Sequence, residues 1–135
     1  MKTKFIDTNI FLRYLTKDNP PMYNRCREIF KNAVEGKVSL TTSCMVIAEL
    51  IWTLSSYYKV PKEDIVEKVS IIISTENLHI PDKDIITDAI ALYSRKNIDY
   101  IDAYNAFFVK YHGINEIYSY DKDFDVLEDI KRQEP

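Results

Sequence analysis

Short stretches of strand character alternate with longer helical segments along this chain, and this alternation constrains the fold more than any other feature. The predicted strands are residues 3–6 (a short buried strand), 38–43, 77–80 and 116–120. The predicted helices are 8–16, Pro20 or Pro21 to Gly36, a helix after Ser43, 61–75, Pro81 to about Lys96, and 99–113. Residues 121–130 are predicted as turn and helix. Strands joined through helices favour parallel pairing with right-handed crossovers, so the order predicts an α/β fold. Such a parallel sheet is covered on both faces.

The length and the polarity of the chain limit the class of protein further. Its 135 residues fit a single domain, 1–135, with its own core. No apolar stretch reaches 18 residues, which argues against a membrane span. Asp7 interrupts any signal-peptide core near the N-terminus, so we expect a cytoplasmic protein.

The histidines and cysteines argue against a zinc enzyme. His79 and His112 are the two histidines of the chain, and Cys26 and Cys44 lack the close spacing of zinc ligands. We therefore expect both cysteines to be small buried side chains.

Four carboxylates stand where surface residues are not expected. Asp7 follows the first strand, Asp121 follows the last, and Glu49 and Asp102 lie in apolar helical segments. Each has a structural alternative. Asp7 can cap a helix, Glu49 can pair with a lysine or be half exposed, and Asp121 can belong to a turn. Asp102 can complete a capping box with Asp99.

Taken together, the four acids favour a metal site. Converging carboxylates repel one another and require a cation, and ligands that are all oxygen favour Mg²⁺ or Mn²⁺. A calcium loop at "DKDFD" is rejected, because Val126 and Arg132 stand where it needs Gly and Glu. A phosphatase nucleophile at "DTN" is rejected because Asn9 replaces its second Asp.

Four stretches in this order, "FIDTNIFLRYL", "SCMVIAELIWTL", "DYIDAYNAFFVKYHG" and "IYSYDKDFDVL", resemble the PIN-domain ribonucleases, and the VapC-like toxins most closely. The resemblance runs from Phe5 to about Leu127 and implies a three-layer α/β/α sandwich around a parallel sheet. By motif position, the catalytic and metal-binding residues would be Asp7, Glu49, Asp102 and Asp121. The supporting residues would be Thr8, Asn9 and Ser119, where Ser119 keeps the hydroxyl of the family's usual Thr-x-Asp motif.

The resemblance also implies an activity. We expect Mg²⁺-dependent hydrolysis of RNA that leaves 5′-phosphate and 3′-hydroxyl ends. Arg13, Lys17 and Lys122 either hold the RNA backbone or are ordinary surface residues. Asp125, one helical turn beyond Asp121, is expected in the outer shell of the metal, and the Asp between them, Asp123, is expected to point away.

Partners follow from the same resemblance. A toxin of this kind implies a small antitoxin protein, and we expect a homodimer with twofold symmetry. Two alternatives remain. One is a non-catalytic PIN-like module that binds RNA or protein. The other is a metal-dependent phosphohydrolase of small substrates, which the scarcity of glycine, two residues in the chain, disfavours.

Overall fold

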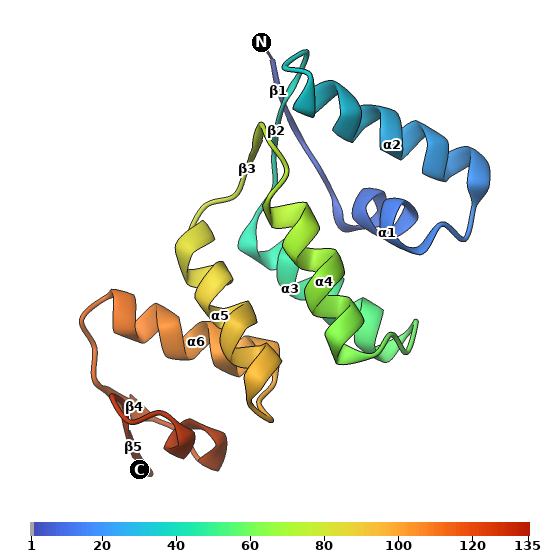
Figure 1. The fold of residues 1–135 in the computed structure, drawn as a ribbon. Coiled ribbons are helices and arrows are strands. Elements are labelled where there is room, and N and C mark those ends of the chain that lie inside the picture. The colour runs from blue at the N-terminus through green and yellow to red at the C-terminus, as the bar shows by residue number, and fades with distance from the viewer. Residues whose placement is uncertain (1) are drawn as a thin grey trace. The chain divides into compact units, whose positions relative to one another are not determined.

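The computed structural model describes residues 2–135, which fall into two compact units, one up to Lys83 and one of Asp84–Pro135. Figure 1 shows both units. The prediction of a single domain over residues 1–135 stays a prediction.

The first unit is built on a three-stranded parallel sheet in the order β1-β2-β3. The strands are β1 (Thr3–Phe5), β2 (Ser39–Thr41) and β3 (Leu78–His79). The helices are α1 (Thr8–Thr16), α2 (Pro20–Val34), α3 (Cys44–Ser56) and α4 (Lys62–Ile73). Two helices follow β1 and two follow β2. Helix α1 packs against α2 and α3, and α3 packs against α4, as can be followed in Figure 1.

The helices of the first unit begin where the sequence supplies caps. The Asn19 side chain accepts a hydrogen bond from the Met22 amide at the start of α2. Ser43 accepts one from the Val46 amide at the start of α3, as predicted. Gly36 follows α2 with a φ of 77°, a left-handed conformation that glycine adopts without strain. The largest side chains that are fully buried in this unit include Phe11, Leu40, Ile47, Leu50, Leu54, Ile65 and Ile72.

The second unit contains two helices, a 3₁₀ helix and a two-stranded parallel sheet. Its elements are α5 (Lys83–Arg95), α6 (Tyr100–Tyr111), β4 (Glu116–Tyr118), η1 (Lys122–Val126) and β5 (Lys131–Gln133). Ile117 of β4 is paired with Arg132 of β5. Phe124 of η1 and Ile130, which directly precedes β5, are buried.

These elements confirm the predicted α/β class and the parallel pairing of the strands. Two details differ. Strand β4 pairs with β5, a strand that was not predicted because its sequence, Lys-Arg-Gln, has no apolar alternation. Strand β1 was expected to be buried, but Phe5 is 58% exposed and only Ile6, just after the strand, is buried. Its position at the edge of the β1-β2-β3 order accounts for this exposure.

Two further predictions concern burial and the membrane. Cys26 is buried, as expected, and burial raises the pKa of its thiol. Cys44 is only half-buried. None of the helices formed by residues 2–135 is long and apolar enough to cross a membrane.

Candidate metal site

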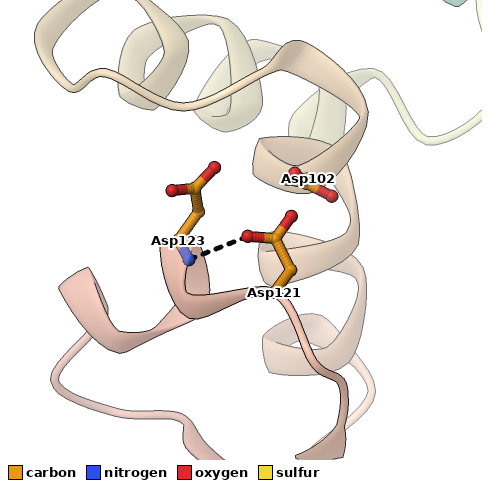
Figure 2. Close-up of side chains that lie close together, drawn as sticks. All are labelled: Asp102, Asp121 and Asp123. Atoms are coloured by element: carbon orange, nitrogen blue, oxygen red, sulfur yellow. Dashed lines mark hydrogen bonds between the residues drawn. The ribbon is translucent and has the colours of Figure 1, made fainter.

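Three carboxylates of the second unit lie together. Asp102 belongs to the first turn of α6, Asp121 stands at the N-cap of η1, and Asp123 lies in the first turn of η1. Each offers an oxygen atom, and these atoms all lie within 4.8 Å of one another. Figure 2 shows Asp121 and Asp123 on one short turn beside Asp102 on its helix. The cluster therefore joins two segments that are far apart in the second unit's sequence.

Local hydrogen bonds fix the turn that carries two of these acids. The Asp121 carboxylate accepts a hydrogen bond of 2.9 Å from the Asp123 amide, drawn as the dashed line in Figure 2. The Ser119 hydroxyl accepts one of 2.9 Å from the Asp121 amide. The turn alternative for Asp121 is therefore correct in part, because one of its oxygens caps η1. The same bond draws the backbone of Asp123 toward Asp121.

The carboxyl group of Asp102 shows the electrostatic cost of this arrangement. Its pKa is raised from 3.8 to about 6. Burial is the largest cause, followed by the hydrogen bond and charge of Asp121, and then by the charges of Asp99 and Asp123. A bound cation would relieve this repulsion, and a set of three carboxylate oxygens suits Mg²⁺ or Mn²⁺. The residues present thus fit the metal that the sequence led us to expect.

The capping-box alternative for Asp102 finds only partial support. Asp99 stands at the N-cap of α6, where the capping-box alternative requires it, but its side chain makes no capping hydrogen bond. The raised pKa of the Asp102 carboxyl has burial as its largest cause, and the neighbouring acids raise it further. A role of Asp102 at a metal stays a prediction.

The first unit contains the other two predicted acids. The Thr8 hydroxyl, on a side chain only 4% exposed, donates a hydrogen bond to the Glu49 carboxylate. Glu49 lies on the exposed face of α3, between the exposed Met45 and Trp52, so its half-exposed alternative is closer to the structure than full burial. Asp7 stands at the N-cap of α1, but its side chain makes no capping hydrogen bond.

A second buried threonine holds the backbone next to Asp7. The Thr42 hydroxyl, 2% exposed, donates a hydrogen bond of 2.8 Å to the Ile6 carbonyl. The segment after β2 is thereby tied to the segment after β1. Asn9, the other supporting residue predicted here, lies on α1 with its side chain exposed.

Two of the three predicted RNA-binding cations have partners within the first unit. Arg13 forms an ion pair of 3.0 Å with Asp18, and this pair holds the pKa of the Asp18 carboxyl below its usual value. The Lys17 ammonium lies 5.2 Å from the centre of the Tyr23 ring. Lys122 is exposed at the start of η1. Contact of these residues with RNA stays a prediction.

The last acids of the chain differ from expectation. Asp123 was expected to point away, but its carboxylate is part of the cluster. Asp125 was expected near the metal, but it forms an ion pair of 2.9 Å with Arg132. The reason is the 3₁₀ turn, in which the Asp121 side chain caps the Asp123 amide, whereas the prediction assumed an α-helical turn. The Asp-x-Asp spacing was the available signal for Asp123, while nothing in the sequence pointed to Arg132.

Comparison with known proteins places the chain in a class. The model of the PIN domain family matches residues 4–130, nearly the whole chain. The chain belongs to the PIN domain family. This confirms the resemblance and the α/β fold expected from the four motifs.

Similarities to individual proteins were also found. The chain is 29% identical over 124 residues to a VapC ribonuclease of Aquifex aeolicus strain VF5, covering 92% of this chain and 91% of the relative. The sarcin-ricin loop cleaving toxin VapC20 of Mycobacterium tuberculosis matches in structure with 15% identity and a TM-score of 0.42, over 95% and 97% of the two chains. VapBC2 from Rickettsia felis, bound to a DNA fragment of its promoter, matches with 18% identity and a TM-score of 0.41, over 98% of both chains.

Proposed function

We propose that this chain is a Mg²⁺-dependent endoribonuclease that hydrolyses RNA phosphodiester bonds and acts as the toxin of a toxin–antitoxin pair. Its metal ligands would be Asp7, Glu49, Asp102 and Asp121. The observation that carries the proposal is the cluster of carboxylate oxygens within 4.8 Å in a chain of the PIN domain family. Mn²⁺ is an alternative ion with the same ligand preference.

The side chains of the second unit support this proposal by their arrangement. Asp102 and Asp121 present oxygens to a common point, and Asp123 adds a third that the sequence had not assigned. Burial is the largest cause of the elevated pKa of the Asp102 carboxyl, and the neighbouring acids raise it further, as expected when acids gather without a counter-ion. When bound, Mg²⁺ would supply a water of lowered pKa and polarise a phosphoryl oxygen.

In the first unit, the side chains of Thr8, Glu49 and Asp7 support the proposal. The Thr8 hydroxyl orients the Glu49 carboxylate, as outer hydrogen bonds commonly orient metal ligands. Asp7 does not use its side chain for capping, and its carboxylate is exposed. Exposed Lys122, next to Asp121 in the chain, is the candidate best suited to hold an RNA phosphate, since Arg13 is engaged by Asp18.

An RNA cleavage assay tests the proposal. The full chain is incubated with RNA in Mg²⁺ and, separately, in EDTA, and the ends of the products are sequenced. We expect cleavage in Mg²⁺ alone, with 5′-phosphate and 3′-hydroxyl ends. Cleavage in EDTA would contradict metal dependence, and binding of RNA without cleavage in Mg²⁺ or Mn²⁺ would favour the non-catalytic alternative.

The antitoxin is the partner that this function requires, because an unrestrained ribonuclease damages its own cell. A groove of about 380 Å³ in the first unit fits a small amphipathic partner segment. It is lined by Tyr14, Arg27, Phe30, Lys31, Val34, Glu35, Ile71 and Thr75. Its exposed apolar members Val34 and Ile71 would contact apolar side chains of the antitoxin, and Arg27 and Lys31 would pair with its acids.

Substitution within this groove tests the partner. We expect the natively expressed chain to co-purify with a small protein and Val34→Asp to lose it, while cleavage of RNA continues. Met22→Asp is the matched control, because Met22 is an exposed apolar residue of the same helix that does not line the groove. Equal retention of the partner by both variants would contradict docking in this groove.

A further inference from the structure

Arg132 of β5 contacts both ends of the turn that carries two of the clustered acids. Its side chain is only 13% exposed, which is uncommon for an arginine. We define residues 119–125 as the acidic loop, because they include Asp121 and Asp123 of the cluster. Arg132 lies outside this loop, on the strand that pairs with β4.

The guanidinium forms a bidentate interaction with Asp125, at the far end of the acidic loop. Its Nε donates to Asp125 Oδ1 at 2.9 Å, and its Nη2 donates to Asp125 Oδ2 at 3.2 Å. This fork is the geometry in which arginine and carboxylate bind most strongly, and lysine cannot reproduce it.

The same guanidinium binds the near end of the loop. Its Nη1 donates to the Ser119 carbonyl at 3.1 Å. Ser119 is further held by its hydroxyl, which accepts a hydrogen bond from the Asp121 amide. A single planar group thus fixes Ser119 and Asp125 relative to each other. Nη1 also donates to Glu134 at 2.9 Å, a contact that lies outside the loop.

We propose that Arg132 is a positioning residue of the metal site, which clamps the acidic loop so that Asp121 and Asp123 present their carboxylates to one cation. The inference rests on the proposed function only in that these two acids bind the metal. Removing a residue that supports a metal ligand from outside the first coordination shell typically lowers metal affinity by roughly ten- to a hundredfold.

Electrostatics alone predicts the opposite effect, which makes the proposal testable by its sign. A positive charge near a cation site weakens cation binding, so removing the Arg132 charge would by itself tighten it. The clamp predicts weaker binding, because the loop is no longer held at both ends.

The experiment measures Mn²⁺ affinity of the full chain from the electron paramagnetic resonance signal of free Mn²⁺, with no RNA present. We expect Arg132→Gln to bind Mn²⁺ roughly ten- to a hundredfold more weakly than the wild type. Arg132→Lys keeps the charge and loses the fork, so it should also bind more weakly. Glu134→Gln is the matched control, because it alters a partner of the same guanidinium that lies outside the loop. The Mn²⁺ affinity of this variant should equal that of the wild type.

A double-mutant cycle with Asp125 separates the clamp from a direct role of Asp125 at the metal. If Asp125 acts through Arg132, Asp125→Asn combined with Arg132→Gln should be no worse than either single variant. Circular dichroism and melting curves show which variants fold. If Arg132→Gln does not fold, Arg132→Lys and Asp125→Asn carry the same test.

Three results would overturn the inference. The first is a Mn²⁺ affinity of Arg132→Gln that equals or exceeds that of the wild type. The second is full affinity in Arg132→Lys with a loss only in Arg132→Gln. The third is a loss of affinity in Glu134→Gln equal to that in Arg132→Gln. A wild-type chain that binds no Mn²⁺ would instead overturn the proposed metal site itself, and the inference with it.

Discussion

The carboxyl group of Asp102 is strongly altered by its surroundings. It has a pKa of about 6, compared with 3.8 in an unperturbed chain. Between these two values the folded protein keeps a proton that the unfolded chain releases. Without metal, this proton stabilises the fold fully below about pH 4, and the stabilisation is lost as the pH rises through about 6.

We therefore predict that, in EDTA, the melting temperature falls between about pH 4 and pH 6 through the contribution of this carboxyl. Asp102→Asn cannot titrate, so it should remove that part of the pH dependence and melt higher than the wild type at pH 7. Thermal melts of both proteins across this pH range provide the measurement. An identical pH dependence in the two proteins would show that Asp102 does not carry the shifted pKa.

Thr8 offers a second prediction at this scale, because its buried hydroxyl donates to Glu49. Thr8→Val keeps the shape and removes the donor, so we expect RNA cleavage to fall about tenfold, the effect of losing an orienting hydrogen bond. Thr8→Ser retains the donor and should keep most of the activity. Rates under identical Mg²⁺ decide the matter, and equal activity of the valine and serine variants would contradict the orienting role.

The sequence pointed to some of these residues and not to others, for physical reasons. Asp102 was conspicuous because a charge in an apolar helix requires a partner. Asp123 was missed because its place depends on a hydrogen bond between its own amide and the Asp121 side chain. Arg132 was missed because its contact with Ser119 depends on the pairing of β4 with β5, which leaves no periodic signal in three polar residues.

At the scale of elements, helices with explicit caps were predicted well. Ser43 and Asn19 cap the helices that follow them, and the positive φ angles of Gly36 and Gly113 lie just after helix ends. Such signals are local and therefore visible in sequence. Strand β5 had no such signal, and the pairing of β4 with β5 depends on contacts that are not local.

The 3₁₀ helix η1 yields a prediction because Asp121 both caps it and belongs to the cluster. Asp121→Asn keeps an oxygen that can cap the helix and loses the charge, so it should abolish cleavage with little loss of stability. Asp121→Ala loses both and should in addition destabilise the fold by about 1 kcal/mol. Chemical denaturation and cleavage rates of the two variants give the test, and equal stability would show that the cap contributes nothing.

Asp123 gives a related prediction, in which the structure revises the expectation from sequence. Its carboxylate lies in the cluster, so Asp123→Asn should lower both Mn²⁺ affinity and cleavage, although less than Asp121→Asn. The reason for the difference is that Asp121 also holds the turn through its hydrogen bond to the Asp123 amide. Full activity of Asp123→Asn would restore the original expectation that this residue is free.

At the scale of the whole molecule, the chain has a formal net charge of −3 at pH 7, although its proposed substrate is a polyanion. Affinity for RNA therefore has to come from bound cations and a few basic side chains more than from overall charge.

The proposed homodimer also belongs to this scale, with a twofold axis as the default symmetry. Light scattering of the purified chain should give a particle of two 15.9 kDa chains, and a monomer at all concentrations would contradict it.

The central claim is the proposed metal-dependent cleavage of RNA, with Asp7 and Asp102 among the proposed metal ligands. The most direct measurement compares RNA cleavage in Mg²⁺ by the wild type, Asp7→Asn and Asp102→Asn, with melting curves as the control for folding. Each substitution removes a ligand charge and keeps the shape of the side chain. We predict that each variant folds and loses more than about a hundredfold in rate, beyond the effect of an outer-shell residue. Cleavage at the wild-type rate by either variant would contradict the assignment of the site.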